Sequence, residues 1–151
     1  MHFKGILRTA VAAGLLAAGG CIDPAEADLT GDWRGDDGAT LVFVPGGRWE
    51  TTGFDWTKIT DAQTVGELQL QSDCTGEWRL VKDIFGGREP VVEITVRTTD
   101  AETQEPRTLF FHLEFAGRGF WGGSRPYDLR THVADGDPDN NNYYTFERTA
   151  P

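Results

Sequence analysis

The fold of this chain is decided by one stretch of alternating residues, Leu109-Phe110-Phe111-His112-Leu113-Glu114-Phe115. Every odd-numbered position in it is apolar, whereas the even-numbered positions include His112 and Glu114. Successive side chains of a strand point to opposite faces, so a period of two places one apolar face against a core. The stretch therefore predicts a half-buried antiparallel strand.

The same period recurs along the chain after residue 30. It predicts strands at residues 39–44, 92–96 and 144–148, and a further short strand around Leu68 and Leu70. Asp-Gly and Gly-Gly sequences, which suit tight hairpins, separate such segments: Asp36-Asp37-Gly38, Pro45-Gly46-Gly47, Gly86-Gly87 and Gly122-Gly123. With about eight strands and no long helix, we predict an all-β fold. A single antiparallel up-and-down β-barrel is favoured over a sandwich, because a closed barrel leaves no open edges.

Three connections between the predicted strands are longer than a hairpin turn. Residues 54–65 are expected to hold a turn of helix. Residues 99–107 are polar and contain Pro106, and residues 134–142 are more polar still, so both are expected to be loops.

Residues 1–20 have the composition of an export signal. Two basic residues precede an apolar run of about 10 residues, half the length that a membrane-spanning helix requires. Small residues then lead to Cys21, and this junction resembles the lipobox of bacterial lipoproteins, whose cysteine is lipidated and becomes the mature N-terminus. Ala18 stands where the lipobox usually has leucine. We predict a lipoprotein signal peptide at 1–20, lipidation of Cys21, a tether at 21–29 and a barrel domain at 30–149.

Other readings of the N-terminus remain open at this point. Secretory cleavage at the A-x-A sequence Ala25-Glu26-Ala27 would leave Asp28 as the first residue. A buried apolar helix is disfavoured, because no other segment has a helical pattern. If neither cleavage occurs, a disulfide between Cys21 and Cys74 is conceivable in an oxidising compartment. The predicted location is the outer face of the cell membrane in the cell envelope, with secretion as the alternative.

The charge of the chain narrows the choice of partners. The net charge is −10, and residues 1–20 contribute Lys4 and Arg8 but no acidic residue. The exported part is therefore more acidic than the whole chain. Such a surface repels nucleic acid, so no nucleic-acid partner is expected. It suits a basic partner or a cation, and it also keeps an exported protein soluble.

One pair of positions resembles a known barrel family. Gly31-x-Trp33 in the first strand, together with Arg148 in the last, is similar to the lipocalin and calycin barrels. The resemblance implies that Trp33 closes one end of the barrel while Arg148 packs across its ring. A guanidinium can stack on an indole while its N–H groups bond to nearby carbonyls.

The wider layout resembles small lipoproteins of actinobacteria. The matching segments are Trp33 to Gly38, Cys74 to Trp78, Gly136 to Asp139 and Tyr144 to Arg148. This resemblance implies a protein of the cell envelope that is attached to the membrane through an N-terminal lipid anchor. It implies no activity.

Candidate sites for chemistry are few. The segment Asp135–Asn142 resembles the start of a calcium loop, but Asn140 replaces the glycine and Phe146 the bidentate glutamate that such a loop needs. We predict no specific calcium site there, because Asp, Asn, Gly and Pro are also good turn formers. His112 or His132 with Glu114 or Asp128 are possible metal or acid–base pairs, but His112 and Glu114 lie on the face predicted to be solvated. We expect no catalytic residue, no metal and no cofactor.

The predicted barrel suits two functions, and whether its interior is hollow or filled decides between them. A hollow barrel would bind a small apolar ligand, with Trp49, Phe111 and Trp121 as possible lining residues. A filled barrel would instead recognise a protein partner on its surface, for example as an inhibitor of an envelope-acting enzyme. The first hypothesis is therefore an exported, lipid-anchored, noncatalytic binding module, and the second is a surface interaction protein.

Overall fold

The computed structural model describes residues 23–82, 90–118, 125–134 and 142–149. In chain order the elements are α1 (Glu26–Leu29), β1 (Gly31–Gly35), β2 (Thr40–Val44), β3 (Arg48–Thr52), η1 (Trp56–Lys58), α2 (Ala62–Glu67), β4 (Cys74–Val81), β5 (Val91–Thr99), β6 (Pro106–Gly117), β7 (Tyr127–His132) and β8 (Tyr143–Arg148). The prefix η marks a 3₁₀ helix.

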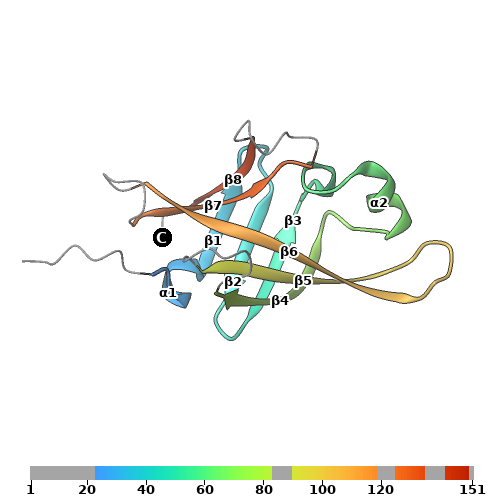
Figure 1. The fold of residues 1–151 in the computed structure, drawn as a ribbon, viewed down its shortest axis with the longest axis horizontal. Helices are drawn as coiled ribbons and strands as arrows, with labels where there is room; N and C mark the ends of the chain where they lie inside the picture. Colours follow the sequence, from blue (N-terminus) through green and yellow to red (C-terminus); the bar gives the residue numbers. More distant parts are fainter. Residues whose placement is uncertain (1–22, 83–89, 119–124, 135–141, 150–151) are drawn as a thin grey trace, which may run out of the picture.

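The strands form a closed barrel in the order β1 to β8, which confirms the predicted all-β, antiparallel, up-and-down barrel of eight strands. Each strand pairs antiparallel with its neighbours in sequence, and β8 closes the ring against β1. Trp33 lies opposite Arg148 in that closing pair. β5 and β6 are the longest strands, and Figure 1 shows their hairpin extending beyond the other strands.

The predicted strands at 92–96, 109–115 and 144–148 lie within β5, β6 and β8. The predicted strand around Leu68 and Leu70 is wrong. The chain there ends helix α2, with Leu68 as its C-cap residue. The helix begins because the Asp61 side chain accepts a hydrogen bond from the Thr64 backbone N–H at 2.8 Å. The expected turn of helix in residues 54–65 is thus confirmed as η1 and the start of α2.

The barrel has two ends, which we name the α1 end and the α2 end. At the α1 end, α1 contacts the β2–β3 turn, where the Gly46 N–H donates to Glu26 Oε1 at 3.4 Å. At the α2 end, the β5–β6 turn contacts α2, where the Ala101 N–H donates to the Glu67 carbonyl at 2.6 Å. Because the strands alternate in direction, every turn between them belongs to one of these two ends.

Residues 23–29, the described part of the predicted tether at 21–29, lie against the α1 end of the barrel. Pro24 and Leu29 are buried, and the Asp23 carboxylate pairs with Lys82 at 3.0 Å. The folded unit described by the structure therefore includes residues before position 30.

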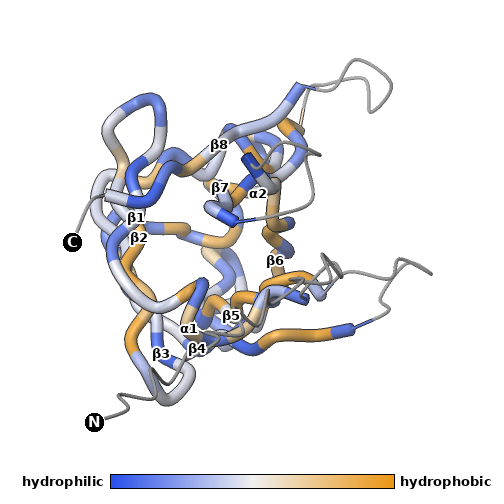
Figure 2. Tube along the Cα trace, turned by 90° about the vertical axis from the view of Figure 1, so that its left-hand side faces the viewer, coloured by the Kyte–Doolittle hydropathy of each residue, from blue (hydrophilic) through white to orange (hydrophobic). Residues whose placement is uncertain are grey.

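The core lies inside the barrel and follows from the alternation of the strands. Figure 2 looks onto the ring of strands and shows hydrophobic residues interspersed with hydrophilic ones along them. The largest fully buried side chains are Trp33, Trp49, Trp56, Tyr144, Phe43, Phe54, Phe146, Leu29, Leu41, Ile94, Leu113 and Leu129. Most of these face inward from the strands, while Phe54 and Trp56 come from the β3–β4 connection.

Candidate functional site

The α2 end of the barrel is filled by two aromatic rings from the β3–β4 connection. Phe54 packs at 4.5 Å from Trp56 and stacks with Phe146 at 5.8 Å between ring centroids. The Trp56 indole N–H donates to the Gln71 carbonyl at 2.7 Å, so its one polar group is satisfied within the barrel. This feature was not predicted from the sequence, although Phe54-Asp55-Trp56 places two aromatic residues in a predicted connection.

The residues predicted to line a ligand cavity pack against Trp56 instead. The Trp49 ring lies 6.4 Å from Trp56, and the Phe111 ring lies 5.1 Å from it. The Trp49 N–H donates to the Thr95 carbonyl at 3.3 Å. Trp121, the third predicted lining residue, lies outside the described residues. The interior around Trp49 and Phe111 is therefore occupied by the protein's own aromatic side chains.

The α1 end is covered by α1 and by the pair of Trp33 and Arg148. Trp33 is 1% exposed, and its indole N–H donates to the Leu29 carbonyl at 2.7 Å. The guanidinium carbon of Arg148 lies 5.8 Å from the centre of the Trp33 ring. Arg148 also donates to the carbonyls of Asp28 and Thr30. This geometry combines a cation–π contact with hydrogen bonds to two backbone carbonyls.

A second arginine holds α1 in place. Arg125 makes two hydrogen bonds to the Asp28 carboxylate. These bonds hold the pKa of Asp28 below its ordinary value despite the burial of the carboxyl. Asp28 also accepts from the Ala25 backbone N–H at 2.9 Å, so its carboxylate ties the chain before α1 to the barrel wall.

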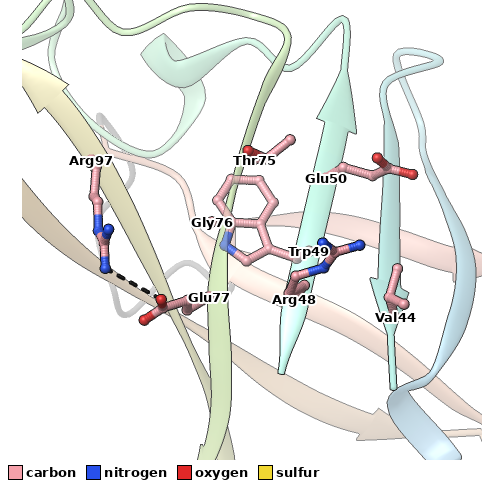
Figure 3. Close-up of a pocket in the computed structure, with 8 residues that line it drawn as sticks. All are labelled: Val44, Arg48, Trp49, Glu50, Thr75, Gly76, Glu77 and Arg97. Carbon is pink, nitrogen blue, oxygen red and sulfur yellow. Dashed lines mark hydrogen bonds and ion pairs between the residues drawn. The ribbon is translucent and has the colours of Figure 1, made fainter. Parts of the chain in front are cut away.

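The outer face of β3, β4 and β5 carries an open groove of about 450 Å³. Figure 3 shows Arg48 and Glu50 on β3, Glu77 on β4 and Arg97 on β5 around it, with the Trp49 indole lying across Gly76. Arg97 pairs with Glu77 at 3.2 Å. The groove is thus lined by solvent-exposed side chains of both positive and negative charge.

Phe110 extends this surface onto β6. Its side chain is 57% exposed, and among the residues that the structure describes no other large hydrophobic residue is exposed. The strand register places Arg48, Glu77, Thr95 and Phe110 side by side in one row across β3 to β6. We call the outward side chains of these four strands the β3–β6 face. The sequence signal that could have indicated this face is Phe110, an aromatic residue at an even, outward-facing position of Leu109–Phe115.

An ion cluster lies on the same β3–β6 face. Arg79 pairs with Glu93 at 2.7 Å, and Glu93 lies 3.2 Å from His112 Nε2. Hydrogen bonding from Arg79, and then from His112, holds the pKa of Glu93 below its ordinary value. His112 therefore contacts Glu93 in the folded protein. Glu114, one of its possible partners from the sequence, pairs instead with Arg130 at 3.4 Å.

The α2 end is acidic. Its turns carry Asp36, Asp37, Asp55, Asp61, Glu67, Asp73, Asp100, Glu102 and Glu105, with Arg34, Lys58 and Arg107 as basic residues nearby. Lys58 pairs with Asp37 at 2.9 Å and with Asp36 at 3.4 Å. Burial would raise the pKa of Asp37, but the bond from Lys58 and those from the Ala39 N–H and the Tyr144 hydroxyl leave it lowered.

Cys74 lies at the start of β4, at the α2 end, whereas Asp23 lies at the α1 end. The eight residues of β4 span about 26 Å, which disfavours the alternative disulfide between Cys74 and Cys21. Burial raises the pKa of the Cys74 thiol to about 11, with a smaller contribution from Asp73.

We expect Cys74 to be a poor nucleophile in the folded protein. At pH 8 a thiol with this raised pKa forms about a hundredfold less thiolate than an ordinary cysteine, and the thiolate is the reactive species. Alkylation by iodoacetamide should therefore be about a hundredfold slower in the native protein than in guanidinium chloride, as measured by mass spectrometry of the peptide containing Cys74. Native and denatured rates within tenfold of each other would contradict this assignment.

Other predicted sites find no further support in the described part of the chain. Within residues 23–82, 90–118, 125–134 and 142–149, no three His, Cys, Asp or Glu side chains are grouped as metal ligands would be. Asp135–Asp139 of the calcium-like loop lie outside the described residues, as does Cys21. None of the described helices has the length and hydropathy needed to cross a membrane. Comparisons of the chain with family models, with curated proteins and with solved structures gave no match.

Proposed function

We propose that this chain is an exported, lipid-anchored, noncatalytic recognition protein that binds a protein partner on its β3–β6 face. The observation that carries the proposal is the filled barrel. Trp56 and Phe54 occupy the α2 end, and Trp33, Leu29 and Arg148 cover the α1 end. A partner therefore meets the outside of the barrel. The binding of a small apolar ligand between Trp49 and Phe111 is disfavoured, because Trp56 already packs against both rings.

The composition of the β3–β6 face suits a protein partner. An exposed aromatic ring with arginines close by is the residue set that most often carries binding energy at interfaces. Phe110 supplies the ring, Arg97 lies on the neighbouring strand β5, and Arg79 lies one strand further, on β4. The adjacent groove offers Glu77 and Arg48 to polar groups of the partner. An inhibitor of an envelope-acting enzyme would be one protein of this kind.

The packing of residues 23–29 supports lipidation at Cys21 over cleavage after Ala27. Cleavage after Ala27 would remove the buried Pro24, the Asp23–Lys82 pair and the bond from Gly46 to Glu26. Processing at Cys21 keeps all of these contacts. The mature N-terminus would then lie two residues before the first described residue.

We expect Phe110 to be central to the interface. A photo-crosslinking amino acid at position 110 should capture one protein partner in intact cells, and the same amino acid at Glu147 should not. Glu147 is the matched control, because it is exposed and faces outward from β8, away from the β3–β6 face.

Binding of the purified partner should then weaken at least tenfold in Phe110→Ser, about 1.4 kcal/mol. The free energy of unfolding should change by less than about 0.5 kcal/mol, since the ring is exposed. Glu147→Gln should bind as the unmodified protein does. Equal affinity of Phe110→Ser and Glu147→Gln, or a small apolar ligand extracted from the purified barrel, would refute the proposal.

A further inference from the structure

We infer that the α1 end of the barrel faces the lipid bilayer and that the acidic α2 end points into the aqueous phase. This inference rests on the lipid anchor of the proposed function and adds the orientation of the folded domain. The occupant of the α1 end is then the surface of the bilayer that holds the anchor. Three observations carry the inference: the short reach of the chain, the pairing of charges at the α1 end, and the acidity of the α2 end.

The first observation is that the chain is fixed to the barrel directly after the predicted anchor. Asp23 pairs with Lys82 at 3.0 Å, and Pro24 is buried. Two residues of chain, Cys21 and Ile22, can extend at most about 7 Å. Acyl chains on Cys21 would therefore hold the α1 end at the level of the lipid headgroups, because so short a connection cannot lift the domain away.

The second observation concerns the charges that would meet the headgroups. Three carboxylates at the α1 end each have a cationic partner: Asp23 with Lys82, Asp28 with Arg125, and Asp128 with Arg118 at 3.1 Å. Arg148 bonds to backbone carbonyls of Asp28 and Thr30 rather than to a carboxylate. Among the residues that the structure describes, Glu26 and Asp32 at this end have no cationic partner, but Arg48 and Arg148 likewise have no carboxylate partner. In this described part of the chain, the α1 end therefore carries acidic and basic side chains in near balance.

The third observation is the charge of the opposite end. At the α2 end, the carboxylates in the β1–β2, β3–β4 and β5–β6 connections outnumber the basic residues beside them. The strands separate these carboxylates from the α1 end by roughly 20 Å, which is more than twice the Debye length of about 8 Å at physiological ionic strength. Repulsion from anionic headgroups is thus smallest when the α2 end points away from the bilayer. The β5–β6 hairpin, which extends toward the α2 end, then reaches into the aqueous phase (Figure 1).

Two matched alanines report the orientation. Ala27 in α1 and Ala101 in the β5–β6 turn are both exposed and lie at opposite ends. Each is changed to cysteine, Ala27→Cys or Ala101→Cys, in the full chain carrying Cys74→Ser, and labelled with the same fluorophore. The lipidated proteins are reconstituted into vesicles of phosphatidylcholine and phosphatidylglycerol that contain a lipid with a nitroxide on its headgroup.

We expect quenching by the nitroxide to be at least threefold stronger for the label at position 27 than for the label at position 101. Equal quenching, or stronger quenching at position 101, in protein that floats with the vesicles would overturn the orientation and leave the anchor intact. Failure of the protein to float, with an unmodified Cys21 in its mass spectrum, would overturn the anchor and the orientation together. The Cys21→Ser chain, which cannot be lipidated, supplies the baseline for both labels.

Discussion

Replacing Trp33 by alanine is expected to lower the free energy of unfolding by about 3–5 kcal/mol, the usual cost of truncating a buried tryptophan. The ring is 1% exposed, so its removal leaves a cavity at the α1 end. The Leu29 carbonyl loses the indole N–H that donates to it at 2.7 Å. Arg148 loses the ring beneath its guanidinium. A loss of this size is a large part of the 5–15 kcal/mol that typically stabilises a domain.

Urea denaturation followed by circular dichroism measures this loss, and two further variants divide it. Trp33→Phe keeps an apolar ring but leaves the Leu29 carbonyl without the indole N–H, at a cost of about 1–3 kcal/mol. Arg148→Ala removes the stacked guanidinium, and a double-mutant cycle with Trp33→Ala should give a coupling energy of about 0.5–1 kcal/mol. A loss below about 1 kcal/mol in Trp33→Ala would show that the indole does not close the barrel.

Strong periodicity explains why most of the barrel could be predicted from the sequence. Within Leu109–Phe115, Leu113 and Phe115 are buried and the residues beside them are less so, whereas the first three residues of β6 are all exposed. Such a pattern excludes a register shifted by one residue, because that shift would turn the apolar face away from the core. The closing pair of β1 and β8 followed from Gly31-x-Trp33 and Arg148, because a resemblance supplied the long-range pairing that periodicity alone does not contain.

The wrong strand around Leu68 and Leu70 has a local cause. Two leucines separated by one residue fit both a strand and the end of a helix that turns back onto the core. Leu70 is buried, but it follows the C-cap of α2. The capping sequence Asp61-Ala62-Gln63-Thr64 was the signal that decides between them, because Asp61 accepts a bond from the Thr64 N–H.

The character of the barrel interior could not be read from the sequence, because it depends on where a connection folds. The number of tryptophans fits a hollow barrel and a filled one equally well. The distinction comes from Phe54 and Trp56, which enter the barrel from outside the sheet and meet Trp49, Phe111 and Phe146. The contacts with Phe111 and Phe146 join segments far apart in sequence, so no local pattern encodes them.

Replacing Gly76 by alanine is expected to lower the free energy of unfolding by about 3 kcal/mol, at the upper end of the usual cost of overpacking a core. A Cβ at this position would lie 2.0 Å from the Thr95 carbonyl oxygen and 2.6 Å from Trp49 Nε1. The first of these atoms belongs to the backbone of β5 and cannot rotate away. The strand pair must therefore separate, and the hydrogen bond from Trp49 to Thr95 is lost with it.

Gly66→Ala is the matched control for Gly76→Ala, since it makes the same chemical change at a glycine without close neighbours. A Cβ on Gly66 meets nothing within 4 Å, and the residue lies inside helix α2. Alanine is the better helix former by about 1 kcal/mol, so this variant should be as stable as the unmodified protein or more stable. Urea denaturation of both variants, with near-ultraviolet circular dichroism as a probe of the tryptophans, tests the pair. Equal stability of the two variants would mean that Trp49 does not lie across Gly76. The aromatic packing around Trp56, on which the proposed surface recognition depends, would then need a different arrangement.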